Sequence, residues 1–306
     1  MNQTGDTNIF EFNNDRFMIR VGLAYMFVSI WLLPLYALIM TAIYIRDRTK
    51  PNMTNKLMNH INFFEVGQAF CHFISSPILI FPYFATAWDW IIRVLGCIIN
   101  TFWIAEFPAM TTLAVSRILI FCDIIQTKRI PIPIKIILFI AYSWIAFVLI
   151  YGCISQNFAF TPPSWGYDFD VEYAELFGIL ELALSFPCLA ISYFSYIFII
   201  YLIYSRKKHS QSKSNRRNEL AIMIQYTFVT TYMVILIFLW HEGDVFLEMT
   251  DLTNAILNCF WIGCSYLNPV LLLILNKQIR NEIHYMLGGV RKMHVTQSVR
   301  TMISNN

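Results

Sequence analysis

Five stretches of this chain contain no Asp, Glu, Lys or Arg, and each is long enough to cross a lipid bilayer as a helix. They cover residues 21–45, 136–167, 182–205, 220–240 and 252–276. An uncharged apolar run of about 18 residues or more indicates a membrane-spanning helix. The segments 57–83 and 91–122 are also apolar, but they contain the isolated charges Glu65, Glu106 and Arg117. The pattern therefore predicts seven spans.

The composition supports a membrane protein. Hydrophobic residues make up 57% of the chain and charged residues only 13%, whereas soluble domains carry about 25% charged residues. We expect an all-α membrane protein, a seven-helix transmembrane bundle covering residues 21–275. Its spans are predicted at about 21–45, 57–83, 91–122, 136–155, 176–204, 220–240 and 252–275. Residues 1–20 are polar and lack the apolar core of a signal peptide, so the first span is expected to direct insertion.

Charged residues between the spans predict the orientation of the chain. One set of connecting segments, at 46–56, 123–135, 205–219 and 276–306, holds 18 basic and four acidic residues. The alternate set, at 1–20, 84–93, 156–175 and 241–251, holds three basic and 12 acidic residues. Lys and Arg accumulate on the cytoplasmic side. We therefore expect an extracellular N-terminus, with a glycosylation sequon at Asn2, and a cytoplasmic tail. Topology alone accounts for this asymmetry, and the basic cluster at 206–217 also suits anionic lipid or a cytoplasmic partner.

Motifs for hydrolytic, metal or nucleotide chemistry do not occur in the sequence. There is no phosphate-binding Gly loop, and His241-Glu242 lacks the second His that a zinc protease helix requires. The seven cysteines show no spacing typical of metal ligands. We predict that the protein is not an enzyme, uses no cofactor or metal, and binds no nucleic acid.

The depth of Arg117 in the third span bears on its role. It lies 26 residues after Ile91, about 39 Å along a helix that rises 1.5 Å per residue. This places it near the inner edge of a core roughly 30 Å thick. One interpretation is an interfacial arginine that reaches lipid phosphates. The other is an inward-facing arginine at a cytoplasmic cleft between helices.

Polar residues recur on one face of the second span. Asn62, Glu65 and His72 follow helical spacing and therefore share a face. Glu106 lies at a depth similar to that of Glu65. A polar stripe in a membrane must face the bundle, because lipid would leave it unsatisfied. The network is either structural, with at least one carboxyl group protonated, or an ion or water site that changes during activation.

Several short motifs along the chain resemble those of a known family. They are Pro34-Leu-Tyr-Ala-Leu-Ile-Met in the first span, Arg217-Asn-Glu-Leu before the sixth, and Leu267-Asn268-Pro269 followed by Asn276-Lys-Gln-Ile-Arg280 at the end of the seventh. Together with an arginine at the inner end of span three, they resemble G-protein-coupled receptors, in particular the nematode serpentine chemoreceptors of the Srg-like superfamily, class V or class X.

The resemblance implies a receptor in the plasma membrane of a chemosensory cell or cilium. It would bind an extracellular small molecule or peptide and activate a heterotrimeric G protein. The resemblance also implies arrestin as a second candidate partner on the cytoplasmic side. Six residues would serve G-protein coupling: Ser116, Arg117, Asn268, Pro269, Asn276 and Arg280. A short amphipathic helix at 277–287 would lie on the inner leaflet.

The sequence also departs from the wider receptor pattern. Ser116 stands where an acid usually precedes the arginine, so no adjacent carboxylate can hold Arg117. The usual outer disulfide joins span three to the second outer loop, but residues 156–175 contain no cysteine. Cys97 and Cys153 either form a bond in its place or remain two buried thiols.

Polar and aromatic side chains in the outer half of the bundle are candidates for a ligand pocket. Small-molecule sites combine aromatic walls with a few polar groups. By type and depth, the candidates are His72, Phe102, Trp103, Glu181, Tyr232 and Trp240.

Two other functions remain open. Glu65, Glu106 and Glu181 are also suited to a transporter or proton-linked carrier, although the chain shows no internal repeat, which many transporters have. A ligand-gated channel of the insect odorant-receptor kind would require a cytoplasmic N-terminus, contrary to the charge count.

Overall fold

The computed structural model describes residues 10–125, 129–205 and 213–288. The elements are α1 (Arg16–Thr49), α2 (Met53–Ser75), α3 (Pro77–Ile80), α4 (Tyr83–Ala87), α5 (Asp89–Phe121), α6 (Ile132–Ser155), β1 (Phe158–Thr161), β2 (Ser164–Tyr167), α7 (Ala174–Ser205), α8 (Lys213–Phe246), α9 (Asp251–Leu275) and α10 (Lys277–Met286). The predicted sequon at Asn2 and the side chains of the basic cluster at 206–217 lie outside this description.

Seven helical segments are long and apolar enough to cross a membrane, which confirms the predicted seven-helix bundle. They are α1, α2 with α3, and α5 to α9. Some helices extend past the predicted spans because polar caps set their ends. Asp15, for example, accepts a hydrogen bond from the amide of Phe17 at 2.8 Å, so α1 begins five residues before the predicted start of span one.

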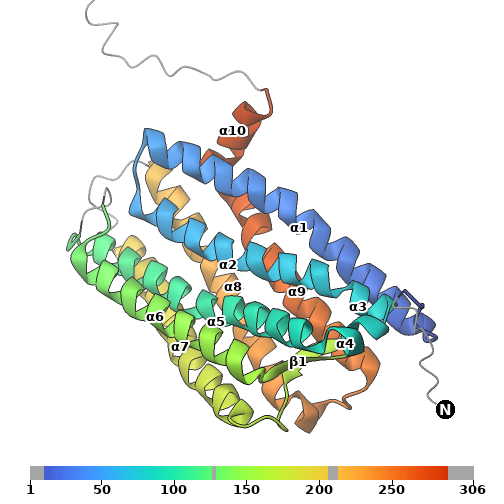
Figure 1. The fold of residues 1–306 in the computed structure, drawn as a ribbon. Helices are drawn as coiled ribbons and strands as arrows, with labels where there is room; N and C mark the ends of the chain where they lie inside the picture. The colour runs from blue at the N-terminus through green and yellow to red at the C-terminus, as the bar shows by residue number, and fades with distance from the viewer. Residues whose placement is uncertain (1–9, 126–128, 206–212, 289–306) are drawn as a thin grey trace, which may run out of the picture.

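Helix α5 lies at the centre of the bundle and packs against α2, α6, α7 and β1 (Figure 1). Its most apolar window is 67% buried, whereas that of α6 is 11% buried. Since α6 is also the most apolar of the seven, most of its surface is suited to lipid. The polar side chains of α5 therefore face other helices.

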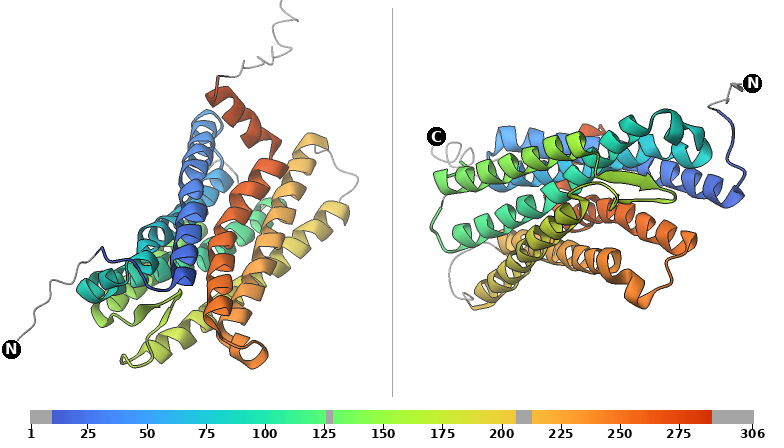
Figure 2. Two further views of the ribbon diagram at one scale, coloured as in Figure 1. Left: turned by 90° about the vertical axis from the view of Figure 1, so that its right-hand side faces the viewer. Right: turned by 60° about the horizontal axis from the view of Figure 1, so that its bottom comes forward.

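A β-hairpin follows α6, at a place where the sequence predicts a loop. Strands β1 and β2 are antiparallel, and Phe158 pairs with Tyr167. The hairpin fits closely over α5 because Gly96 has no side chain: a Cβ atom there would lie 2.6 Å from the ring of Trp165. In two views the hairpin and α10 lie at opposite ends of the bundle (Figures 1 and 2). We call these the hairpin end and the α10 end.

Helix α10 confirms the short amphipathic helix predicted after the seventh span. The side chain of Asn276 caps it by accepting hydrogen bonds from the amides of Gln278 and Ile279 at 3.1 and 3.2 Å. Ile279 and Ile283 are buried, and α10 packs against α1 and α9. Its apolar face is thus covered in part by protein.

Candidate functional site

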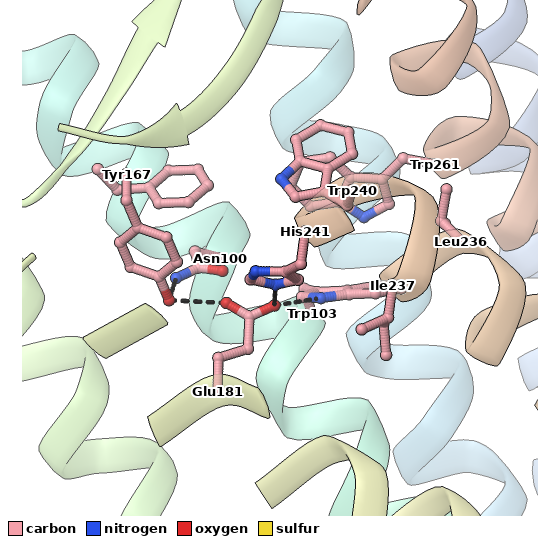
Figure 3. Close-up of a pocket in the computed structure, with 10 residues that line it drawn as sticks. Asn100, Trp103, Tyr167, Glu181, Leu236, Ile237, Trp240, His241 and Trp261 are labelled. Carbon is pink, nitrogen blue, oxygen red and sulfur yellow. Dashed lines mark hydrogen bonds and ion pairs between the residues drawn. The ribbon is translucent and has the colours of Figure 1, made fainter. Parts of the chain in front are cut away.

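A pocket opens at the hairpin end between α5, α7, α8, α9 and the hairpin (Figure 3). It holds about 350 Å³ not occupied by protein atoms, including the part open to solvent. The lining residues are Asn100, Trp103, Phe158, Tyr167, Glu181, Leu236, Ile237, Trp240, His241 and Trp261. Four helices and a hairpin thus enclose a mostly aromatic space with few polar groups, the usual composition of a small-molecule site.

The carboxylate of Glu181 is the central polar group of the pocket (Figure 3). The indole of Trp103 donates to its Oε1 at 2.9 Å, and the phenol of Tyr167 donates to its Oε2 at 2.7 Å. Asn100 donates in turn to the Tyr167 oxygen at 2.9 Å. Nε2 of His241 lies 4.0 Å from Oε1. Glu181 itself is only 6% exposed. Groups from α5, β2 and α8 therefore surround its carboxylate in place of water.

The hairpin supplies Tyr167 in a form that can donate to Glu181. Burial, together with the negative charge of Glu181, raises the pKa of the Tyr167 phenol well above its usual value. The phenol therefore stays protonated at neutral pH. The Tyr167 phenol can therefore donate to Glu181 at neutral pH.

Three indoles from three helices form an aromatic wall of the pocket. The ring of Trp261 lies 5.7 Å from that of Trp103 and 5.3 Å from that of Trp240, measured between centroids. The interplanar angles are 66° and 75°, an edge-to-face arrangement that aromatic quadrupoles favour. The rings therefore hold one another in place.

An ion-pair cluster fixes the loop beside the pocket. Arg93, in the first turns of α5, lies 2.7 Å from Asp168 and 3.0 Å from Asp89. It also donates to the carbonyl of Gln156 at 3.2 Å. Because Asp168 directly follows Tyr167, this cluster holds the end of β2 against α5.

A hydrogen-bonded chain leads from the pocket into the centre of the bundle. The indole of Trp261 donates to Oε1 of Gln68 at 2.8 Å, and Nε2 of Gln68 donates to Oε2 of Glu106 at 3.0 Å. Glu106 and Glu65 are both buried, and the charges of the two carboxyl groups act on each other.

The same chain continues toward the α10 end through Asn268. Oε2 of Glu65 accepts from Tyr36 at 2.7 Å and from Asn268 at 2.8 Å. Nδ2 of Asn268 also donates to Asn62 at 3.0 Å, and its Oδ1 accepts from Gln225 at 2.6 Å. Side chains from α1, α2, α5, α8 and α9 are thus joined. The predicted polar stripe faces the bundle as expected.

Arg117 lies inside the bundle and is 3% exposed. Its charge acts on two buried phenols from other helices, Tyr196 of α7 and Tyr226 of α8. Their rings stack with centroids 6.0 Å apart. The hydroxyl of Ser116 donates to its own helix, at the carbonyl of Leu113. The side chain therefore faces the interior of the bundle, and the cytoplasmic cleft stays a prediction.

Only part of the predicted pocket set lines the pocket. Trp103, Glu181 and Trp240 do so. His72 lies behind the wall, with its ring 5.0 Å from that of Trp261. Phe102 packs against Phe63 and Phe64. The Tyr232 hydroxyl donates to the carbonyl of Phe260 at 2.9 Å.

Sequence reasoning missed seven lining residues: Asn100, Phe158, Tyr167, Leu236, Ile237, His241 and Trp261. A signal existed for four of them. Asn100 lies three residues before Trp103, and Ile237 and Leu236 lie three and four before Trp240, so each shares a helix face with a predicted residue. His241 directly follows Trp240. The position of Tyr167 depends on the hairpin, which no spacing in the sequence indicates.

Other predicted residues have structural contacts. Cys97 and Cys153 are free thiols, and Cys97 donates to the carbonyl of Gly152 at 3.1 Å. Pro269 is buried within α9. Arg280 donates to the last carbonyls of α9, at Leu273 and Ile274.

Comparison with known proteins adds no assignment. No family model matches the chain, and no curated protein matches it. Among the described residues, no group of three His, Cys, Asp or Glu side chains is arranged to hold a metal ion.

Proposed function

We propose that this protein is a chemosensory G-protein-coupled receptor. A small molecule binds in the pocket at the hairpin end, which faces the outside of the cell. Binding shifts the equilibrium toward a state that admits a heterotrimeric G protein at the α10 end. The sequence resemblance to nematode serpentine chemoreceptors suggests this class, and the location follows as the plasma membrane of a chemosensory cell.

One observation carries the proposal: a mostly aromatic pocket is joined by hydrogen bonds to a polar network that extends toward the other end of the bundle. Trp261 belongs to both, because it lines the pocket and donates to Gln68. The network ends at Asn268 and Gln225, next to Tyr226, which interacts with Arg117. A ligand shifts the equilibrium between two states only if it binds one of them more tightly. Trp261 provides a route for this, because a ligand that contacts it also affects its hydrogen bond to the network.

The charge asymmetry of the connecting segments supports the proposed orientation. The acidic segments 156–175 and 241–251 lie at the hairpin end, and the basic segment 46–56 lies at the α10 end. Basic residues accumulate on the cytoplasmic side. The pocket then faces outward, where an external chemical arrives.

A reporter experiment tests the function. The full-length chain is expressed with a promiscuous G protein and exposed to a broad panel of small molecules. The variant Arg117→Ala should lower the maximal response roughly tenfold or more while ligand affinity is kept. Arg48→Ala is the matched control, because Arg48 is exposed and near the same end. Unchanged G-protein activation in Arg117→Ala removes this residue from the mechanism.

The paired carboxyl groups of Glu65 and Glu106 favour a second candidate, a proton-linked carrier. Buried carboxyl groups are typical of proton pathways in membranes. A carrier would accumulate a substrate in vesicles when a pH gradient is imposed, without any G protein. Such uptake, abolished by Glu106→Gln, would replace the receptor proposal.

A further inference from the structure

The pocket contains one carboxylate, that of Glu181, and its nearest neighbours include no permanently charged cation. Among the described residues that line the pocket, Glu181 is the only Asp or Glu, and there is no Lys or Arg. The donors at 2.9 and 2.7 Å, Trp103 and Tyr167, are neutral. They orient the carboxylate but leave its charge in place. His241 is 4.0 Å away and carries a charge only when protonated. A buried carboxylate is costly without a cationic partner.

The walls around this carboxylate suit a positive charge. Trp103, Trp240 and Trp261 line the space with edge-to-face indoles, and Tyr167 and Phe158 add two further aromatic rings. The face of an indole is the aromatic surface that attracts organic cations most strongly, and quaternary ammonium groups are bound by such aromatic cages. An aromatic cage with one carboxylate has little to offer an anion.

The charges around the pocket also favour a positively charged ligand. The described segments at the hairpin end, 10–20, 84–93, 156–175 and 241–251, hold eleven acidic and three basic residues. One of the three, Arg93, is already paired with Asp89 and Asp168. A cleft within a negative surface raises the local concentration of cations and speeds their entry.

We propose that the pocket binds a small organic cation, an amine or a quaternary ammonium compound, with its charged nitrogen between the Glu181 carboxylate and the indoles. This proposal rests on the proposed receptor function, because it takes this pocket as the ligand site. Ligands that are anionic, or neutral with the same shape, bind much more weakly because they leave Glu181 without a counter-charge.

Binding to the purified full-length chain is measured separately from signalling. The probes are matched sets: choline and its neutral carbon isostere 3,3-dimethylbutan-1-ol, and phenethylamine with phenethyl alcohol and phenylacetate. A compound that binds the folded state raises the melting temperature. We expect ammonium compounds to stabilise the wild type and their neutral and anionic counterparts to have no effect at equal concentration.

Variants assign the charge contact to one residue. Glu181→Gln keeps the shape and should weaken binding of the ammonium probes by about tenfold to a hundredfold. The matched control Glu175→Gln makes the same change at an exposed position of α7 and should bind as the wild type does. If Glu181→Gln does not fold, Trp240→Leu tests the cage, and we expect quaternary ammonium binding to fall severalfold.

Each result has a defined meaning. Any one of three results overturns the cation proposal. One is that the neutral isosteres stabilise the protein as much as the ammonium probes do, and another is that no ammonium probe binds. The third is ammonium binding that is unchanged in both Glu181→Gln and Trp240→Leu. Responses to neutral or anionic compounds that depend on Arg117 would overturn it while the receptor function stands. Ammonium binding that depends on Glu181 but produces no G-protein signal would support the cation site and count against the receptor.

Discussion

The indole N–H of Trp261 donates a hydrogen bond to Oε1 of Gln68 across 2.8 Å. This one contact joins the wall of the pocket to the polar network, because Gln68 also donates to Glu106. Gln68 is 1% exposed, so neither partner has water as a ready substitute. A displacement of Trp261 by a ligand therefore changes the partners of a buried polar group rather than only the packing of the wall.

Replacing Trp261 with Phe should separate binding from signalling. Phe keeps an aromatic wall but removes the donor, which leaves Gln68 Oε1 without a partner at a cost of about 1–3 kcal/mol. We expect the maximal G-protein response to fall severalfold, with a smaller change in ligand affinity. Concentration–response curves normalised to surface expression provide the measurement.

Trp144→Phe is the matched control for this substitution. The Trp144 indole nitrogen has no hydrogen-bond partner among the described residues, so the same chemical change should leave signalling intact. An unaltered maximal response in Trp261→Phe would show that the bond to Gln68 does not transmit the signal.

Spacing along the helices predicted the centre of the molecule well. Asn62 and Glu65 lie on a common buried face, and the depth of Glu106 placed it beside Glu65, because a helix fixes both rise and rotation per residue. Gln68, three residues after Glu65, satisfies the same rule and was overlooked. The depth of Arg117 was informative, but its direction depends on how α5 is rotated against α7 and α8.

The hairpin end could not be predicted in the same way. Tyr167 reaches Glu181 because the antiparallel register pairs it with Phe158. That register depends on the packing of Trp165 over Gly96, a tertiary contact. A loop between two spans carries no periodic pattern that fixes such a contact. The pocket was therefore predicted only from its helical side.

The second prediction concerns Glu65. In Glu65→Gln the side-chain carbonyl still accepts from Tyr36 and Asn268, and the new amide can donate to Glu106. The fold should therefore persist, while the ionisable group beside Glu106 is lost. We expect surface expression close to that of the wild type and a change of roughly fivefold or more in signalling efficiency.

Surface labelling and reporter assays on the same cells separate the two effects of Glu65→Gln. Glu242→Gln, at an exposed position of α8, is the control. If Glu65→Gln greatly reduces surface expression and the molecules that remain at the surface signal normally, the network has a structural role only.

The third prediction tests how the hairpin is held. In Gly96→Ala the added Cβ would lie 2.6 Å from the Trp165 ring and 3.0 Å from the carbonyl oxygen of Phe158. Overpacking of this kind costs about 1–3 kcal/mol. We expect a lower melting temperature in detergent and a weaker ligand response, because Phe158 and Tyr167 move with the hairpin. Gly166→Ala is the matched control, since nothing lies within 4 Å of its Cβ position. Equal stability of the two variants would contradict the close fit of the hairpin.

The last prediction separates two roles of Asn276, which caps α10 and also belongs to the motif that suggested G-protein coupling. Ala removes the acceptor for the amides of Gln278 and Ile279 and should cost about 1 kcal/mol, seen as roughly fivefold faster hydrogen exchange over residues 277–286. Asp is as good a cap as Asn, so Asn276→Asp should keep both the protection and the signal if capping is the role. Normal protection with a lost signal in Asn276→Asp would instead indicate that the amide itself contacts the G protein.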